Sequence, residues 1–309
     1  MVGALKYSKD LDRIAVKAAQ EILHARVIRS QKIPKGEINH AYKVETDKGI
    51  FLVKAFGIKF CSDDGSLRWI SQVLTKHGIR HQKIIYHSRY GKYFPFGFII
   101  LEYIEGQMGC DVIGGEVCFE DFYFRIGKIL KIVHEIKTPR WGDINNGRGE
   151  YDDLIEFIMK DIDGCCKELP CYILSHNSRE KAKRIVRDIL VPYKDRFKPA
   201  LVHCDAMPDN CVWTPGKEIV LIDWDNAMAL PWLQDLAVIT YLEKGNENRA
   251  RDAFLRGHGF EEFTLDEIRE AEKSFQIWFS IRLLSFFHFE KQNFNSTQRT
   301  KEKLIQLLK

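Results

Sequence analysis

The sequence predicts an α+β fold with two lobes, a β-rich N-terminal lobe followed by a mainly helical C-terminal lobe. Short apolar runs bounded by turn residues fill the first hundred residues, whereas apolar residues recur at helical spacing beyond Gly106. With 309 residues and 45% hydrophobic content, the chain is long enough for both lobes to bury a core. We therefore expect a first lobe over residues 1–101, a hinge over 102–106 and a second lobe over 107–309.

The first lobe is predicted to open with a helix that Ser8 caps and that runs to about Ala25. Its other elements are expected to be three strands (27–33, 40–46, 50–56), a helix (63–77) and two further strands (83–86, 96–101). Asp47-Lys48-Gly49 joins the second and third strands. Because glycine tolerates a left-handed backbone, this loop predicts a β-hairpin.

The second lobe is predicted to be helical, with one short β-hairpin around residues 210–223. The helices are expected over residues 121–136, 151–162, 179–193, 232–242 and 265–290. A strand-rich lobe joined to a helical lobe by a short segment leaves a crevice at the joint, which is a common place for a ligand.

The charge pattern excludes several classes of protein. The net charge is +4, and no run of five basic residues occurs, so we expect phosphate or nucleotide ligands and no nucleic acid. The longest apolar run, residues 94–101, is too short for a membrane span, and the N-terminus lacks a signal pattern. We expect a cytoplasmic protein whose eight cysteines are free thiols, because no Cys-x-x-Cys pair occurs.

The most informative segment contains His203-x-Asp205-x4-Asn210 and a hairpin that leads to Asp223. If the turn centres on Pro215-Gly216, Asn210 lies opposite Leu221, and Asp223 is its diagonal neighbour at ~7–8 Å. Two oxygen-bearing side chains at that separation can share a Mg²⁺ ion at ~2.0–2.1 Å from each. Asp205, on the loop before the hairpin, can accept a hydroxyl proton, while Asn210 and Asp223 hold the metal ion. Phosphoryl transfer requires this division of roles.

These residues also have a structural interpretation. Asp205 and Asn210 are residue types that cap turns, and Asp223 is a residue type that ends a strand. His203 is better explained as a buried hydrogen-bonding residue than as a catalyst.

Residues 203–210 together with Ile222-Asp223-Trp224-Asp225 resemble the catalytic loop and metal-binding segment of the aminoglycoside phosphotransferase/choline kinase superfamily. The Asp235-Leu236-Ala237 sequence is similar to the usual continuation. The resemblance implies a bilobal, protein-kinase-like fold, with Asp205 as the catalytic base and Asn210 and Asp223 as Mg²⁺ ligands. The family usually has glycine where this chain has Cys204.

Lys54 is the only charge in the apolar segment 50–56. A buried lysine is costly unless paired, which favours a functional role, although an edge lysine that extends to solvent is the alternative. The loop before the preceding strand, with Asn39, resembles the nucleotide-covering loop of the family. The resemblance implies that Lys54 binds ATP phosphates and pairs with an acid on the next helix, which aligns with Asp63, or else Asp64. The alternative is that these acids complement the helix dipole.

Residues 101–106 look like the hinge of the same family. The resemblance implies that the Glu102 carbonyl and the Ile104 N–H face the edge of the purine, with Leu101 at the back of the pocket. Together these residues predict an ATP- and Mg²⁺-dependent phosphotransferase that acts on a hydroxyl of a small molecule of the aminoglycoside, amino alcohol or sugar type. The alternative is a catalytically weak or inactive nucleotide-binding pseudokinase or regulatory module.

The sequence does not determine the acceptor class, and it indicates no oligomeric state. Beyond Gly245, ten acidic residues face eleven basic ones, so charge does not favour a polycationic aminoglycoside. Aromatic residues near Trp278 and Phe286 can form a cage for a choline-like amine, but their spacing favours a buried helix. The Asp-Phe-Gly and Ala-Pro-Glu segments typical of protein kinases are absent from the sequence.

Overall fold

The computed structural model describes residues 11–34, 39–57, 64–89, 92–167, 169–260 and 262–309. The chain forms two compact units, each with its own packing. The first contains Met1–Asp111 together with Pro208–Asp225, and the second contains Val112–Met207 together with Asn226–Lys309. The segment 208–225, predicted to lie in the second lobe, therefore groups with Met1–Asp111.

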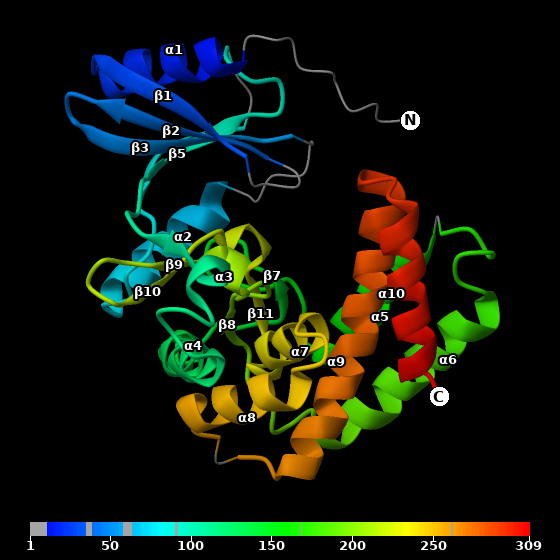
Figure 1. Ribbon diagram of the computed structural model, residues 1–309. Helices are drawn as coiled ribbons and strands as arrows, with labels where there is room; N and C mark the ends of the chain where they lie inside the picture. Colours follow the sequence, from blue (N-terminus) through cyan, green and yellow to red (C-terminus); the bar gives the residue numbers. More distant parts are fainter. Residues whose placement is uncertain (1–10, 35–38, 58–63, 90–91, 168, 261) are drawn as a thin grey trace. The chain divides into compact units, whose positions relative to one another are not determined.

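The first unit is built on a five-stranded antiparallel sheet in the order β1-β2-β3-β5-β4. The strands are β1 (Val27–Ile33), β2 (His40–Thr46), β3 (Gly49–Ala55), β4 (Ile84–Ser88) and β5 (Phe98–Glu102). Helix α1 (Leu11–Leu23) covers one face of this sheet (Figure 1) and buries its alanine-rich side against Tyr42, Val53 and Ile100. Helix α2 (Asp64–Lys76) follows β3 in the chain. The predicted hairpin is confirmed, with Thr46 paired with Gly49.

A second, three-stranded sheet in the first unit has the order β10-β9-β6. Its strands are β6 (Gln107–Met108), β9 (Cys211–Trp213) and β10 (Ile219–Leu221). Ile104, Val212 and Val220 form the small buried core beneath it. The segment 208–225 thus gains apolar contacts with residues 104–108, which explains why it groups with the first unit.

The predicted register of the β9–β10 hairpin is wrong by one residue. Leu221 pairs with Cys211, and the Ile222 N–H donates to the Asn210 carbonyl at 2.9 Å. The cause is the loop, which spans five residues because Lys217, rather than Gly216, takes the left-handed conformation with φ of 60°. Thr214 and Glu218 close this loop through a backbone hydrogen bond of 2.9 Å.

The second unit is mainly helical, as predicted. Its longer helices are α4 (Phe119–His134), α5 (Leu154–Lys167), α6 (His176–Leu190), α7 (Leu233–Leu242), α8 (Glu247–His258), α9 (Leu265–Ser285) and α10 (Phe294–Leu307). Helix α9 packs against α5, α6, α7 and α10 (Figure 1). It begins with a capping box, in which Thr264 and Glu267 exchange hydrogen bonds, and it passes into one π-helical turn at Phe286–Glu290.

Two of these longer helices, α8 and α10, are not among those predicted from the sequence. Both are rich in charged and polar residues, and their apolar stripes are narrow, so the helical period is weak. A three-stranded antiparallel sheet in the order β7-β11-β8 completes the second unit. Its strands are β7 (Gly142–Asp143), β8 (Ala200–Val202) and β11 (Met228–Leu230).

Among the described residues, no helix has the length and apolar character needed to span a bilayer.

Candidate active site

Lys54 is buried in β3 and forms two short ion pairs within the first unit. Its Nζ lies 2.7 Å from Asp223 Oδ1 and 2.6 Å from Asp225 Oδ2. Both carboxylates come from the segment after β10, about 170 residues further along the chain. Burial alone opposes the ammonium charge, but the two carboxylates outweigh it and raise the pKa of Lys54. The lysine is therefore charged at neutral pH.

Asp225 is the more enclosed of the two carboxylates. Burial raises its pKa, the Lys54 ammonium opposes this effect, and the nearby Asp223 carboxylate adds to it. Sequence reasoning assigned no role to Asp225. The Asp-x-Asp spacing after an apolar strand was the available signal, because two acids on one short turn can reach a single cation.

Asp223 adopts a left-handed backbone conformation with φ of 62°. Strand β10 ends at Leu221, so the chain turns sharply where the predicted metal-binding segment begins. The diagonal relation between Asn210 and Asp223 predicted for a regular ladder is therefore wrong. Instead, the Asn210 backbone bonds to Ile222, the residue directly before Asp223.

The donor atoms of this segment fit Mg²⁺. Asn210, Asp223 and Asp225 supply only amide and carboxylate oxygens, the ligand type that magnesium prefers. The Asp223 side chain is 40% exposed and that of Asp225 is 25% exposed, so both keep accessible surface beyond their contacts with Lys54.

The other residues predicted to bind the nucleotide also lie in the first unit. The Asn39 side chain accepts a hydrogen bond from the Gly57 N–H at 3.3 Å, which ties the start of β2 to the end of β3. In the hinge, the Glu102 carbonyl accepts from Gln82 Nε2 at 3.3 Å. Within the described ranges, the Ile104 N–H makes no hydrogen bond, although Ile104 is buried.

Leu101 lies in β5 opposite Leu52 and is partly buried. Asp63, the acid that the resemblance aligned with Lys54, lies outside the described residues.

The predicted catalytic loop follows β8 in the second unit and is held by a fully buried carboxylate, Asp235. Asp235 Oδ1 accepts from the Cys204 N–H at 2.7 Å, and Oδ2 accepts from the His203 N–H at 3.1 Å. Asp235 comes from α7, whose other side chains are almost all buried and mostly apolar. The lone acid in an apolar helix was the signal that sequence reasoning did not use.

Two histidines extend this network. His134 Nε2 donates to Asp235 Oδ2 at 3.0 Å, and His134 Nδ1 lies 3.0 Å from His258 Nε2. Burial, with further contributions from His134 and nearby lysines, lowers the pKa of His258 to about 3. A neutral His258 is consistent with its stacking on Trp232, where the ring centroids are 4.5 Å apart.

Cys204 adopts a backbone conformation that favours glycine. Its φ is 63°, a left-handed conformation that costs a residue with a Cβ roughly 1–2 kcal/mol. The hydrogen bond from its N–H to Asp235 holds the backbone in that conformation. The buried His203 ring accepts from the Asp205 N–H at 3.2 Å, and Asn226 Nδ2 lies 3.5 Å from Asp205 Oδ2. The loop is thus fixed mainly through its backbone.

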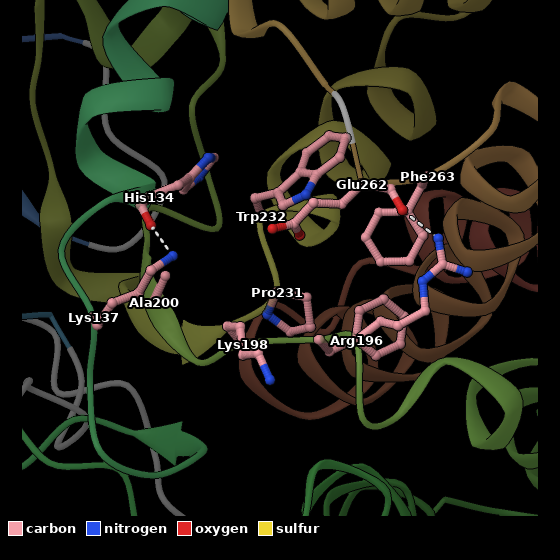
Figure 2. A pocket seen from close by; sticks show the side chains of 10 residues that line it. His134, Lys137, Arg196, Lys198, Ala200, Pro231, Trp232, Glu262 and Phe263 are labelled. Carbon is pink, nitrogen blue, oxygen red and sulfur yellow. Dashed lines mark hydrogen bonds between the residues drawn. The ribbon is translucent and has the colours of Figure 1, made fainter.

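At the other end of β8, near Ala200, the second unit has a pocket (Figure 2). Its lining includes Trp232, Lys198 and Glu262, and none of the predicted site residues. Lys137 donates to the His134 carbonyl at the edge of this pocket. Through His134, the pocket wall is connected to Asp235 and hence to the predicted catalytic loop.

Trp278, considered from the sequence as part of an aromatic cage, is fully buried in α9. Its indole N–H donates to Asp161 Oδ2 at 2.6 Å. Its burial agrees with the interpretation as core.

Comparisons with known proteins agree with this architecture. A model of the phosphotransferase enzyme family matches residues 30–271. Aminoglycoside phosphotransferase APH(4)-Ia is 13% identical with a TM-score of 0.72, over 96% of this chain and 98% of that chain. Choline kinase LicA from Streptococcus pneumoniae is 16% identical with a TM-score of 0.70, over 97% and 99% of the two chains.

A putative fructosamine-3-kinase from Haemophilus somnus 129PT is 14% identical with a TM-score of 0.63, over 97% of both chains. A thermostable mutant of APH(4)-Ia is known as a ternary complex with AMP-PNP and hygromycin B. No curated protein matches this chain by sequence. At these identities the solved structures establish the predicted fold class.

Proposed function

Because this chain belongs to the phosphotransferase enzyme family, we propose that it transfers the γ-phosphate of ATP, bound with Mg²⁺, to a hydroxyl group of a small molecule. The observation that carries this proposal is the buried Lys54 paired with Asp223 and Asp225. A charged lysine beside two carboxylates is the combination that binds nucleotide phosphates and their metal ion.

In the proposed nucleotide site, Lys54 binds phosphate oxygens, and Asn210 and Asp223 hold Mg²⁺, with Asp225 beside them. When bound, the ion neutralises charge on the phosphates. The Ile104 N–H, which has no acceptor within the described ranges, is available to the purine together with the Glu102 carbonyl. Leu101 and Asn39 complete the proposed contacts. Nucleotide complexes of the APH(4)-Ia mutant support the use of ATP.

Asp205 is the proposed catalytic base. As the bond between the acceptor oxygen and the γ-phosphorus forms and the bond to the ADP oxygen breaks, the acceptor hydroxyl loses its proton to the Asp205 carboxylate. The Asp235 hydrogen bonds fix the backbone before Asp205, so the carboxylate is held in place without a large entropy cost in the reaction.

The proposal is tested by ADP release from the purified protein with Mg·ATP and a panel of sugars, amino alcohols and aminoglycosides. We expect at least one acceptor to raise ADP release and to appear as a phosphorylated product in mass spectrometry. Calorimetry of the Asp223→Ala variant should show ATP affinity that no longer depends on Mg²⁺.

Asp209→Ala, which removes an exposed acid from the same segment, is the matched control and should keep the Mg²⁺ dependence. Unchanged Mg·ATP affinity in Asp223→Ala would contradict the metal role. Tight ATP binding with no transfer to any acceptor would favour the nucleotide-binding regulatory module instead.

A further inference from the structure

The sheet β7-β11-β8 of the second unit brings an acid close to the start of the catalytic loop. Met228 pairs with Asp143 on one side and with Val202 on the other. Because neighbouring strands lie ~4.7–4.9 Å apart, Asp143 and Val202 are separated by roughly two strand spacings. Val202 leads directly into the loop that carries Asp205. Asp143 and the catalytic loop therefore share one end of this sheet.

Helix α9 places a guanidinium group at the same end. Arg282 Nη1 donates to Met228 Sδ at 3.2 Å, and Arg282 Nε lies 3.9 Å from Asp161 Oδ2. The Trp278 ring lies under the guanidinium, with 5.4 Å between the guanidinium carbon and the ring centroid. These three contacts hold Arg282 over the central strand of the sheet.

The Arg282 and Asp143 side chains both retain unused hydrogen-bonding groups. Within the part of the chain that the structure describes, the only hydrogen bond of the Arg282 side chain is to a thioether, which is a weak acceptor. The same side chain is 36% exposed. Asp143 is exposed and has no hydrogen bond or ion pair within those same ranges.

The two groups nevertheless lie close enough to affect each other. Surrounding protein raises the pKa of Asp143, and the Arg282 charge opposes that shift. Burial opposes the charge of Arg282, but Asp161 and Asp143 outweigh it and raise the pKa of the guanidinium. Arg282 is thus a permanent cation that lies near two carboxylates.

We propose that Arg282 binds a carboxylate group of the acceptor, while Asp143 accepts a hydrogen bond from a hydroxyl or amine of the same molecule. The planar guanidinium fork matches a carboxylate through two parallel hydrogen bonds. The acceptor is then a hydroxy acid, with the reacting hydroxyl presented to Asp205. This inference rests on the proposed phosphotransferase function and adds the substrate class.

The local charges disfavour a phosphate ester as the acceptor. A phosphate ester, with nearly two negative charges, would face Asp143 and Asp205 with one guanidinium to balance it. A single carboxylate matches the single arginine.

The test uses pairs of acceptors that differ only in charge. Glycerate, gluconate, serine and homoserine are compared with their primary amides, with choline, kanamycin and glycerol phosphate as further probes. ADP release above the acceptor-free rate gives kcat/KM, and thermal shift reports binding. For the best pair, we expect kcat/KM for the carboxylate to exceed kcat/KM for the amide by about 10- to 100-fold. This is the range of a charge-assisted bidentate contact.

Arg282→Gln should reduce that ratio to about 1–3, mainly through a higher acceptor KM, and should leave the KM for ATP unchanged. Arg282→Lys keeps the charge but not the planar guanidinium, so it should give an intermediate ratio. This variant also allows the inference to be tested if Arg282→Gln does not fold. Arg269→Gln, an exposed arginine of the same helix, should leave the ratio at its wild-type value.

Preferred use of the amides, of choline, of kanamycin or of glycerol phosphate would overturn the inference and leave the phosphotransferase function intact. A carboxylate preference that survives in Arg282→Gln would also overturn it. If no compound is phosphorylated although Mg·ATP binds, the proposed function fails. The inference is then decided by thermal shift, where carboxylates must stabilise the wild type and not Arg282→Gln.

Discussion

The two charged centres of this protein are built in opposite ways. In the first unit, Lys54 faces two carboxylates that both retain exposed surface. In the second unit, Asp235 is completely buried, and its oxygens accept from two backbone N–H groups and one imidazole. The first centre joins charge to charge, and the second joins a carboxylate to backbone and imidazole N–H donors.

Because of this difference, the Lys54 centre can exchange its charged partners, whereas the Asp235 centre cannot. Exposed carboxylate surface next to Lys54 leaves room for phosphate and metal to enter the same group of charges. Every oxygen of Asp235 is already used in a place that water does not reach, where an unpaired charge is strongly unfavourable. The first centre therefore has the properties of a binding site, and the second has those of a support for the loop before Asp205.

The largest expected effect concerns Asp205, which the supported loop carries. Asp205→Asn should lower kcat by ~10²–10⁴-fold, because the amide cannot take a proton. ATP affinity and the free energy of unfolding should stay unchanged, since the Asp235 contacts involve the backbone. Steady-state kinetics with calorimetry provide the measurement. Asp209→Asn, the same exchange at an exposed acid, should retain full activity, and an active Asp205→Asn variant would exclude the proposed base.

The support itself is broken by Asp235→Ala. The change leaves the His203 and Cys204 N–H groups and the His134 ring without their acceptor, which should lower the free energy of unfolding by about 3–5 kcal/mol. Urea denaturation gives this value. Gln234→Met is the matched control in the same helix, because the buried Gln234 Oε1 has no partner within the described ranges. It should be neutral or stabilising, and a loss below 1 kcal/mol in Asp235→Ala would contradict the supporting role.

A smaller effect on stability is expected for Lys54→Met, although ATP binding should weaken strongly. Because both carboxylates are partly exposed, we expect Lys54→Met to lower the free energy of unfolding by only about 1–3 kcal/mol at neutral pH. The pKa of Asp225 is raised above its ordinary value of 3.8, so the folded state binds the carboxyl proton more tightly than the unfolded state. The free energy of unfolding therefore falls as pH rises from the ordinary pKa through the raised pKa. Removing the ammonium raises that pKa further.

The difference between Lys54→Met and wild type should therefore shrink as pH falls from neutral toward 4. Urea denaturation at several pH values measures this trend. Lys32→Met, at an exposed position of β1, should change stability by less than about 0.5 kcal/mol at every pH. A deficit that grows toward low pH would show that the two carboxylates are not the charges that Lys54 stabilises.

The smallest expected effect is a gain in stability for Cys204→Gly. Relief of the left-handed strain is partly offset by the greater freedom of glycine in the unfolded chain, so the net gain is about 1 kcal/mol or less. Differential scanning calorimetry should show a modest rise in Tm. Cys204→Ser keeps the Cβ and should show no rise, and a lower Tm for the glycine variant would mean that packing of the Cys204 thiol matters more than the strain.

The sequence determined the parts of this structure that depend on neighbouring residues. Alternation, helical period and Asp47-Lys48-Gly49 predicted the β2–β3 hairpin and most helices. The spacing of Asp205, Asn210 and Asp223 predicted a segment rich in the groups needed for phosphoryl transfer, and a family match over residues 30–271 agrees with it. These features are local because backbone geometry and turn chemistry are set within a few residues.

Only the tertiary structure decided which distant residues meet. One extra residue in the loop at Lys217 moved the β9–β10 register, and no local pattern states which residue of a turn takes a left-handed conformation. The partners of Lys54 come from beyond β10, about 170 residues away. Arg282 reaches Met228 because α9 packs near β11. Such pairings depend on how whole elements bury their apolar faces. A single sequence indicates where those faces are, but it does not indicate which of them pack together.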